Sequence, residues 1–260
     1  MCSAERNGPP LAPPGPRSVL GRAALLLDCL AAGDSPGISE LARRSGLAKT
    51  TVFRLVHELA GCGLVEVTSG GVRLGMRLFE LGSSVPRQRS LAEAALPIMR
   101  DLQQATGDTV HLAVLDRTEV VYLQILRGSG TRPLPSRVGG RMPAHATGVG
   151  KAILAFSSRP VLDAVMAAGL RPRTARTIVA PGALRRELSR IRQAGTAFDR
   201  EESGPGIVCA ASPVFGADGA VLAGLSLTGW SARLNLARAA PAVRTAALAL
   251  SRQLGSVPRQ

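Results

Sequence analysis

Hydrogen-bonding and charged side chains are concentrated on one face of a predicted helix that ends near Gly61. The opposite face is apolar, because hydrophobic residues recur at three- and four-residue spacing: Val52, Leu55, Val56 and Leu59. The polar face, richest in the first two turns, consists of Lys49, Thr50, Thr51, Phe53, Arg54 and His57. Donors and cations at the start of a recognition helix reach the base edges and phosphates of DNA. We predict that Thr51 and Arg54 contact bases and that Lys49 and Thr50 hold phosphates, whereas Phe53 and His57 either face DNA or shield the helix.

A second predicted helix precedes this one, and a turn centred on Gly46 joins the two. Leu41 and Ala42 lie on its inner face, and Ala42 is small at the point where the helices would cross. Glycine adopts positive φ without strain, as such a tight turn requires. The segment Ile38–Gly61 is therefore typical of a helix-turn-helix. An ordinary helical hairpin in a protein core is the alternative interpretation.

A short hairpin is expected directly after the helix-turn-helix. Two brief strands, Leu64–Thr68 and Val72–Leu74, flank the turn Ser69-Gly70-Gly71. This order predicts the wing of a winged helix, in which Arg73 would touch backbone phosphate. The apolar stretch Val19–Leu30 would form the third side of a small helical core.

A second group of chemically suggestive residues follows Ala146. The run Thr147-Gly148-Val149-Gly150-Lys151 opens a predicted helix, where free N–H groups and the helix dipole favour an anion such as a carboxylate. It is not a phosphate-binding loop, because His145 occupies the position of the first glycine. Ala152 also follows the lysine where Ser or Thr would hold magnesium.

Two predicted strands near the C-terminus provide a polar wall for the same kind of site. Ile207 and Cys209 share one face of their strand, and Ser226 and Thr228 share one face of the next. Because Asp218-Gly219 is a hairpin turn signal, both pairs are expected on one wall. Catalysis is a rival interpretation, with Cys209 as nucleophile and His145 or His111 as base. A buried strand thiol more often packs than reacts, so we predict no enzyme.

The elements around these residues indicate an α+β fold. We expect a linker helix over Gln88–Thr106, strands at Thr109–Leu115 and Glu119–Leu126, and a closing helix over Leu234–Leu254. Between them we predict three helices and the strands Thr196–Glu201, Ile207–Phe215 and Ala220–Thr228. The helices are Thr147–Phe156, Pro160–Ala168 and Ala183–Ala194. Hairpin-linked strands with helices on one face suggest a ligand-sensing domain built on an antiparallel sheet.

Composition limits the remaining possibilities. The 260 residues suit two compact domains or one large one, and the net charge is +14, with only two lysines among 32 basic residues. Most of that charge follows Glu80, so charge alone does not identify the DNA-binding part. The cysteines Cys2, Cys29, Cys62 and Cys209 form no CxxC pair and have no histidine at metal spacing, which indicates a reduced cytoplasmic protein without a metal. We predict no cofactor and no membrane contact. We also predict no RNA binding, because aromatic residues, on which RNA bases stack, make up only 3% of the chain.

Several stretches together resemble the IclR (isocitrate-lyase regulator) family of transcription regulators. They are ELARRSGLAKTTVFRLVHEL, the wing GVRLG, MPAHATGVGKAILAF, AFDREESGPGIVCAASPVF and LSLTG. The resemblance extends from about Arg17 to Leu254. It implies an N-terminal winged helix-turn-helix domain, a linker helix and a C-terminal GAF-like effector-binding domain, in homodimers or homotetramers on double-stranded operator DNA. We assign residues 1–16 to a disordered start, 17–80 to the DNA-binding domain, 81–106 to the linker and 107–260 to the effector domain.

The resemblance also implies which residues bind a small metabolite. Family pocket positions match Leu134, Met142, Gly148, Val149, Asp199, Ile207, Cys209, Ser226 and Thr228. The family often has serine at the position of Thr228, and other residues at that of Val149, so the preferred ligand is expected to differ. Asp199 either selects ligands with a donor group or belongs to a solvated charge run. The sequence thus predicts a repressor or activator controlled by a small molecule; an architectural DNA-binding protein is the other alternative.

Overall fold

The computed structural model describes residues 18–31, 33–129 and 134–255, so the expectation for residues 1–16 lies outside the described residues. The chain forms two compact units, Met1–Pro86 and Arg87–Gln260. Each unit has its own hydrophobic core, and each is described by itself below.

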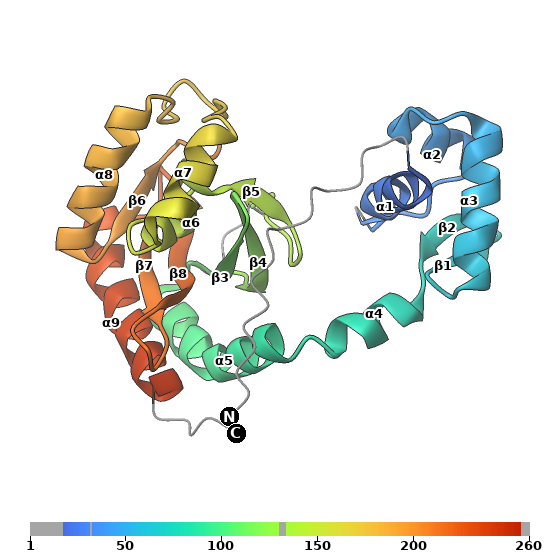
Figure 1. Cartoon of the computed structure of the whole chain (residues 1–260). Helices are drawn as coiled ribbons and strands as arrows, with labels where there is room; N and C mark the ends of the chain where they lie inside the picture. The colour runs from blue at the N-terminus through green and yellow to red at the C-terminus, as the bar shows by residue number, and fades with distance from the viewer. Residues whose placement is uncertain (1–17, 32, 130–133, 256–260) are drawn as a thin grey trace, which may run out of the picture. The chain divides into compact units, whose positions relative to one another are not determined.

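The first unit is a winged helix. Its three core helices are α1 (Val19–Leu30), α2 (Ile38–Ser45) and α3 (Lys49–Gly61). The wing follows as the antiparallel pair β1 (Val65–Thr68) and β2 (Gly71–Leu74), and α4 (Met76–Ser83) comes next (Figure 1). The turn between α2 and α3 contains Gly46 at φ +68°, as its position predicted.

One compact core holds the winged helix together. Leu26 and Leu30 of α1 meet Leu41 of α2, the apolar stripe of α3, and Val65 and Val72 of the wing. Ala42, which the sequence placed on the inner face, and Leu47 are partly buried against this core. Because the apolar side of α3 is used for packing, its other side is left facing outward.

The second unit is built on a six-stranded antiparallel sheet in the order β5-β4-β3-β8-β7-β6. The strands are β3 (Thr109–Asp116), β4 (Glu119–Leu126), β5 (Arg141–Pro143), β6 (Ala197–Arg200), β7 (Ile207–Phe215) and β8 (Val221–Trp230). The helices are α5 (Pro86–Thr106), α6 (Gly148–Leu154), α7 (Arg159–Ala167), α8 (Pro181–Ala194) and α9 (Leu236–Gly255), with a 3₁₀ turn at Ala144–Ala146.

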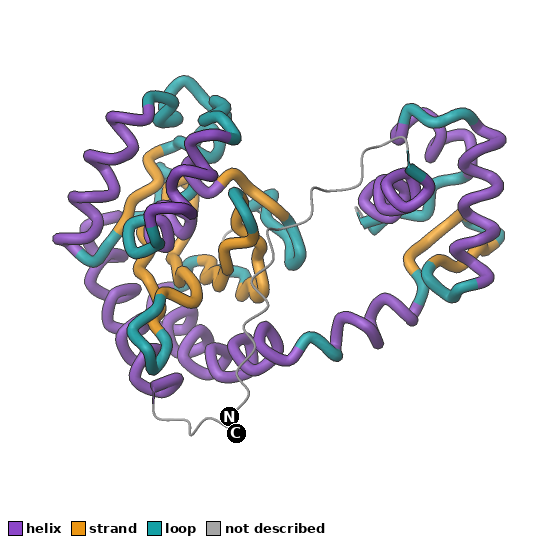
Figure 2. The backbone as a smooth tube through the Cα atoms, in the orientation of Figure 1, coloured by secondary structure: helices purple, strands orange, loops and turns teal. Residues whose placement is uncertain are grey.

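Helices cover both faces of this sheet, which corrects the expectation of helices on one face. Alternate residues of β7 and β8, such as Val208 and Leu225, pack against α5 and α9. The intervening residues, such as Cys209 and Ala211, pack in a second core with α6, α7 and α8. Helices therefore lie on both sides of the strands (Figure 2). Residues on both faces of the central strands are apolar or small, so these strands lack the polar and apolar alternation that would indicate one exposed face.

Three elements were not predicted, namely α4, β5 and the 3₁₀ turn, and β8 continues two residues beyond its expected end to include Gly229 and Trp230. All three are eight residues long or shorter, and such short elements carry little periodic signal. Across the described ranges, no helix combines the length and apolar character needed to cross a membrane.

Candidate functional sites

The polar face of α3 is exposed, as a DNA-reading surface requires. Lys49, Thr50, Arg54 and His57 are exposed, and Thr51 is half-buried. Phe53 is 54% exposed, and its ring lies 4.3 Å from that of His57, centroid to centroid. The structure thus presents all six predicted α3 residues on one surface. The pairing of the two rings fits either role foreseen for them.

The arginines predicted to contact DNA differ in their surroundings. Arg54 has only a loose pair with Glu58 at 3.7 Å, so its guanidinium is available to a base edge. Arg73, on the wing, lies 2.6 Å from Glu66 of the facing strand. A phosphate contact by Arg73 therefore competes with this ion pair.

A cavity of about 430 Å³, called the central cavity below, lies in the second unit. All nine residues that the family resemblance implied line it: Leu134, Met142, Gly148, Val149, Asp199, Ile207, Cys209, Ser226 and Thr228. They come from β5, α6, β6, β7, β8 and the segment before β5. The structure therefore brings together residues that are up to 94 positions apart in sequence, from Leu134 to Thr228.

Three paired residues on neighbouring strands of the sheet form the floor of the central cavity. Asp199 is paired with Cys209, and Cys209 with Thr228, across β6, β7 and β8. Gly148 of α6 packs directly on Cys209, since a Cβ on this glycine would come within 3.0 Å of the sulfur atom. Burial raises the pKa of the Cys209 thiol to about 12, with the charge of Asp199 adding to the effect. The thiol is therefore held in its neutral form at pH 7, which disfavours nucleophilic attack.

Lys151 has a different role from the one that its position in the motif suggested. It is fully buried, does not line the central cavity, and forms an ion pair with Glu202. Thr147 accepts a hydrogen bond from the backbone N–H of Gly150 at 3.1 Å, which uses one of the free donors at the start of α6. The anion site predicted at the start of α6 therefore has fewer free donors than expected. Lys151 stabilises the fold through its ion pair with Glu202.

Several cavity residues were missed by sequence reasoning. Among them are His111, Tyr122, Arg137 and Arg173. No local pattern marks them, because each belongs to a different element and becomes a neighbour of the others only through the fold. His111 was considered only as a catalytic base. His145, the other candidate base, lies against the backbone oxygen of Arg171 at 3.1 Å and outside the cavity lining.

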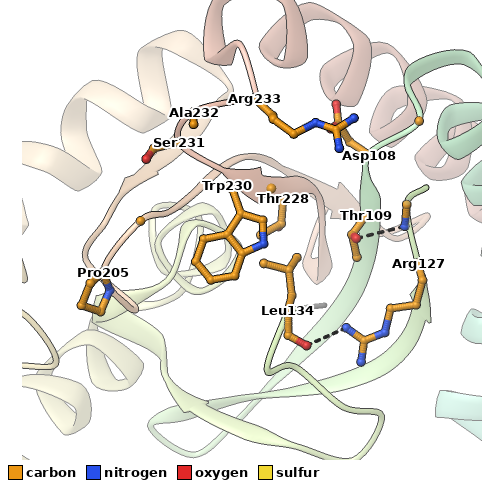
Figure 3. A pocket seen from close by; sticks show the side chains of 14 residues that line it. Asp108, Thr109, Arg127, Leu134, Pro205, Thr228, Trp230, Ser231, Ala232 and Arg233 are labelled. Atoms are coloured by element: carbon orange, nitrogen blue, oxygen red, sulfur yellow. Dashed lines mark hydrogen bonds between the residues drawn. The ribbon is translucent and has the colours of Figure 1, made fainter. Parts of the chain in front are cut away.

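A second cavity, of about 830 Å³ and called the Trp230 cavity below, adjoins the first. The indole of Trp230 lies among the residues that line it, and Arg233 and Asp108 lie close together at one side (Figure 3). Leu134, Pro205 and Thr228 line both cavities. Across the described ranges, no three His, Cys, Asp or Glu side chains are grouped closely enough to hold a metal ion.

Among the described residues that line the central cavity, Asp199 is the only acidic one. It is 2% exposed, and its Oδ1 accepts from the backbone N–H of Glu202 at 2.7 Å and that of Ser203 at 3.3 Å. Burial raises the pKa of Asp199 to about 6, and the charge of Glu202 adds to this, while hydrogen bonds with the Ser203 side chain and the Glu202 backbone and the charge of Lys151 oppose it. Cys209 and Tyr122 are the other titratable groups that interact with it.

Asp199→Asn is expected to stabilise the second unit at pH 7.5. Because folding raises the pKa of Asp199, the folded state disfavours the charged carboxylate, and stability is lost as pH rises from about 4 to about 6. An amide still accepts at Oδ1 but carries no charge, so a gain of up to about 3 kcal/mol is expected above pH 7 and little gain below pH 4. Urea unfolding followed by Trp230 fluorescence at both pH values measures it. Equal gains at the two pH values would contradict this account.

Comparisons with known proteins agree with this architecture. The family model described as "IclR helix-turn-helix domain" matches residues 19–69, and "Bacterial transcriptional regulator IclR C-terminal" matches residues 84–252. The chain is 34% identical to the HTH-type transcriptional regulator XynR of Escherichia coli over 224 residues, 84% of this chain and 89% of XynR.

Solved structures show the same relationship. An IclR homologue from Microbacterium hydrocarbonoxydans complexed with 4-hydroxybenzoate has a TM-score of 0.81 and 30% identity, covering 92% of this chain and 100% of the homologue. The IclR of Thermotoga maritima has a TM-score of 0.72 and 31% identity, covering 91% and 98%. With a helix-turn-helix domain and an effector-binding C-terminal domain both matched, the chain belongs to the IclR family of bacterial transcriptional regulators.

Proposed function

We propose that this regulator reads an operator with Thr51 and Arg54 and that a small carboxylate in the central cavity controls the reading. The observation that carries the proposal is the division of α3: its apolar side is buried in the core of the winged helix, and its donor-rich side is open. Lys49, Thr50 and Arg73 would hold phosphates, and Phe53 and His57 would flank the base contacts. As an operator-reading protein it acts where the chromosome lies, in the bacterial cytoplasm.

The charges around the central cavity support an anionic effector. Three arginines line it, Arg137, Arg141 and Arg173, against the single carboxylate of Asp199. Arg141 is paired with Asp116 and Glu119, whereas Arg137 and Arg173 have no ion pair within the described part of the chain. A carboxylate entering the cavity therefore meets two unpaired cations. The relative that was crystallised with 4-hydroxybenzoate supports the same class of ligand.

We further propose that the protein acts as a homodimer or a dimer of dimers. In α4 no residue is buried, and Met76 and Phe79 are 64% and 71% exposed; Leu20 of α1 is 75% exposed. Large exposed apolar side chains on a small domain indicate a surface that contacts another protein. We propose that a second copy of this chain covers this surface, because an operator with two-fold symmetry is read by two copies of the regulator. Effector binding would then alter the spacing of the two reading heads, with a coupling of about 1–3 kcal/mol.

The test is selective DNA binding by the full chain. Wild-type protein is expected to retain a specific genomic fragment, such as the region upstream of its own gene, in an excess of non-specific DNA. Thr51→Ala/Arg54→Ala is expected to lose about 100-fold or more in specific affinity, since each base contact contributes about 1–3 kcal/mol. Its affinity for non-specific DNA is expected to change little.

Arg190→Ala is the matched control, because this exposed arginine of α8 lies in the basic second unit. It is expected to bind the operator as wild type does. If all fragments bind alike and only Arg190→Ala weakens them, the second unit supplies the affinity and the proposed reading surface is wrong. The mass of the free protein in solution, measured alongside, is expected to be an even multiple of 26.9 kDa.

A further inference from the structure

A row of hydrogen bonds leads to the wall of the central cavity from a residue outside it. Arg127, just after β4, places Nη1 3.4 Å from the hydroxyl oxygen of Ser136, which lies 2.8 Å from Nε2 of His111. On the other side of the imidazole, Nδ1 lies 3.0 Å from Oγ1 of Thr228. The Thr228 hydroxyl lies 3.2 Å from that of Ser226, so five residues form one connected row.

The imidazole in the middle of this row is neutral. His111 is 3% exposed, and burial lowers its pKa to about 3, with the charge of Arg127 adding to the effect. A neutral imidazole has one donor nitrogen and one acceptor nitrogen. Which nitrogen carries the proton follows from the hydrogen-bond network around it.

The guanidinium of Arg127 favours one direction of the row. A guanidinium can only donate, so the Ser136 oxygen accepts from it, and the Ser136 hydroxyl keeps a proton that it can donate to Nε2 of His111. When Nε2 accepts this proton, Nδ1 carries the imidazole proton and donates a hydrogen bond to Oγ1 of Thr228. The Thr228 hydroxyl, whose oxygen then accepts from His111, has one proton to donate, either to Ser226 at 3.2 Å or to a ligand that enters the cavity.

We propose that His111 is a specificity-determining residue of the central cavity, which positions the Thr228 hydroxyl as a donor and thereby selects a carboxylate over the corresponding neutral alcohol. Hydrogen bonds to a charged acceptor are about twice as strong as those between neutral groups, so a fixed donor at this point favours a carboxylate oxygen. His111 acts through Thr228 and is a positioning residue. This inference rests on the proposed carboxylate effector and adds the residue that enforces it.

The experiment compares two ligands in each protein. Kd values are measured by calorimetry on the full chain for acetate, butanoate, benzoate and 4-hydroxybenzoate, each paired with its primary alcohol. His111→Phe keeps a ring beside Tyr122, whose centroid lies 5.0 Å away, but removes both hydrogen bonds. It is expected to weaken the best-bound acid about tenfold or more and to change the Kd of the paired alcohol by less than about threefold. His111→Gln, which retains a donor and an acceptor, is expected to recover part of the loss.

Thr228→Val provides a second test should His111→Phe fold poorly, and it is expected to reproduce the selective loss of the acid. Ser212→Ala is the control, since this buried hydroxyl lies on β7 outside the cavity lining and pairs with Thr196. The inference would be overturned if either variant raised the Kd values of the acid and the alcohol equally, or if neither variant changed the Kd of the acid. The carboxylate proposal would stand in both cases. If none of the acids binds wild-type protein at millimolar concentration, the carboxylate proposal itself fails, and this inference with it.

Discussion

Replacing Lys151 by methionine is expected to lower the free energy of unfolding of the second unit by about 3–5 kcal/mol. Lys151 is 0% exposed and pairs with Glu202, which is 6% exposed. The other carboxylate oxygen of Glu202 has no partner and is the one buried side-chain polar atom in that state within the described part of the chain. Removal of the ammonium would therefore leave a buried carboxylate with no hydrogen bond from any side chain.

The measurement is urea unfolding followed by Trp230, the single tryptophan of the chain, which reports on the second unit. The double variant Lys151→Met/Glu202→Leu is expected to recover most of the stability, because replacing a whole buried ion pair by apolar residues is often neutral. Arg176→Met is the control: its pair with Glu201, at 3.4 Å, is exposed, and its loss should lower stability by less than about 1 kcal/mol. A loss below about 1 kcal/mol in Lys151→Met itself would contradict the prediction.

Gly150→Ala is expected to destabilise the same unit by about 3 kcal/mol. A Cβ at this position would lie within 3.0 Å of three backbone atoms of Ala144, and backbone atoms cannot move aside as a flexible side chain can. Helix α6 therefore lies against the backbone of the preceding 3₁₀ turn only because residue 150 has no side chain. The clash also displaces Gly148 and Val149, which line the central cavity, so weaker effector binding should accompany the loss of stability.

Gly182→Ala is the matched control for this change. Gly182 lies in the first turn of α8, and a Cβ there meets nothing closer than the end of the Arg186 side chain at 3.7 Å. Alanine is favoured over glycine in a helix by about 1 kcal/mol, so this variant should be unchanged or slightly more stable. Similar unfolding midpoints for Gly150→Ala and Gly182→Ala would show that the close approach of α6 to Ala144 is not needed.

These two predictions concern residues whose role the motif around them did not reveal. Lys151 and Gly150 belong to the run that suggested an anion site at the start of α6. In the structure one is a buried ion-pair partner and the other permits close backbone packing. The partner of Lys151 is 51 residues away, and the backbone that requires Gly150 belongs to a 3₁₀ turn that the sequence pattern did not predict.

Local patterns were sufficient for much of the fold. The stripe Val52, Leu55, Val56 and Leu59 predicted the buried side of α3, and Asp218-Gly219 predicted the turn between β7 and β8. Both signals are short-range, because helix period and turn chemistry act over a few residues. The nine cavity residues came from the family resemblance, which carries three-dimensional information that a single sequence lacks.

By itself, the sequence determined the type of each long element, the polar face of α3 and the two-domain order, since these depend on the spacing of apolar residues along the chain. Only the tertiary structure decided that helices cover both faces of the sheet, that Arg73 is paired with Glu66, and that His111 touches Thr228, 117 residues away. The physical reason is the same in each case. The spacing of apolar residues indicates which side of a helix or strand is buried. Which side chain a residue then contacts on another element depends on strand order and register, which only the folded chain defines.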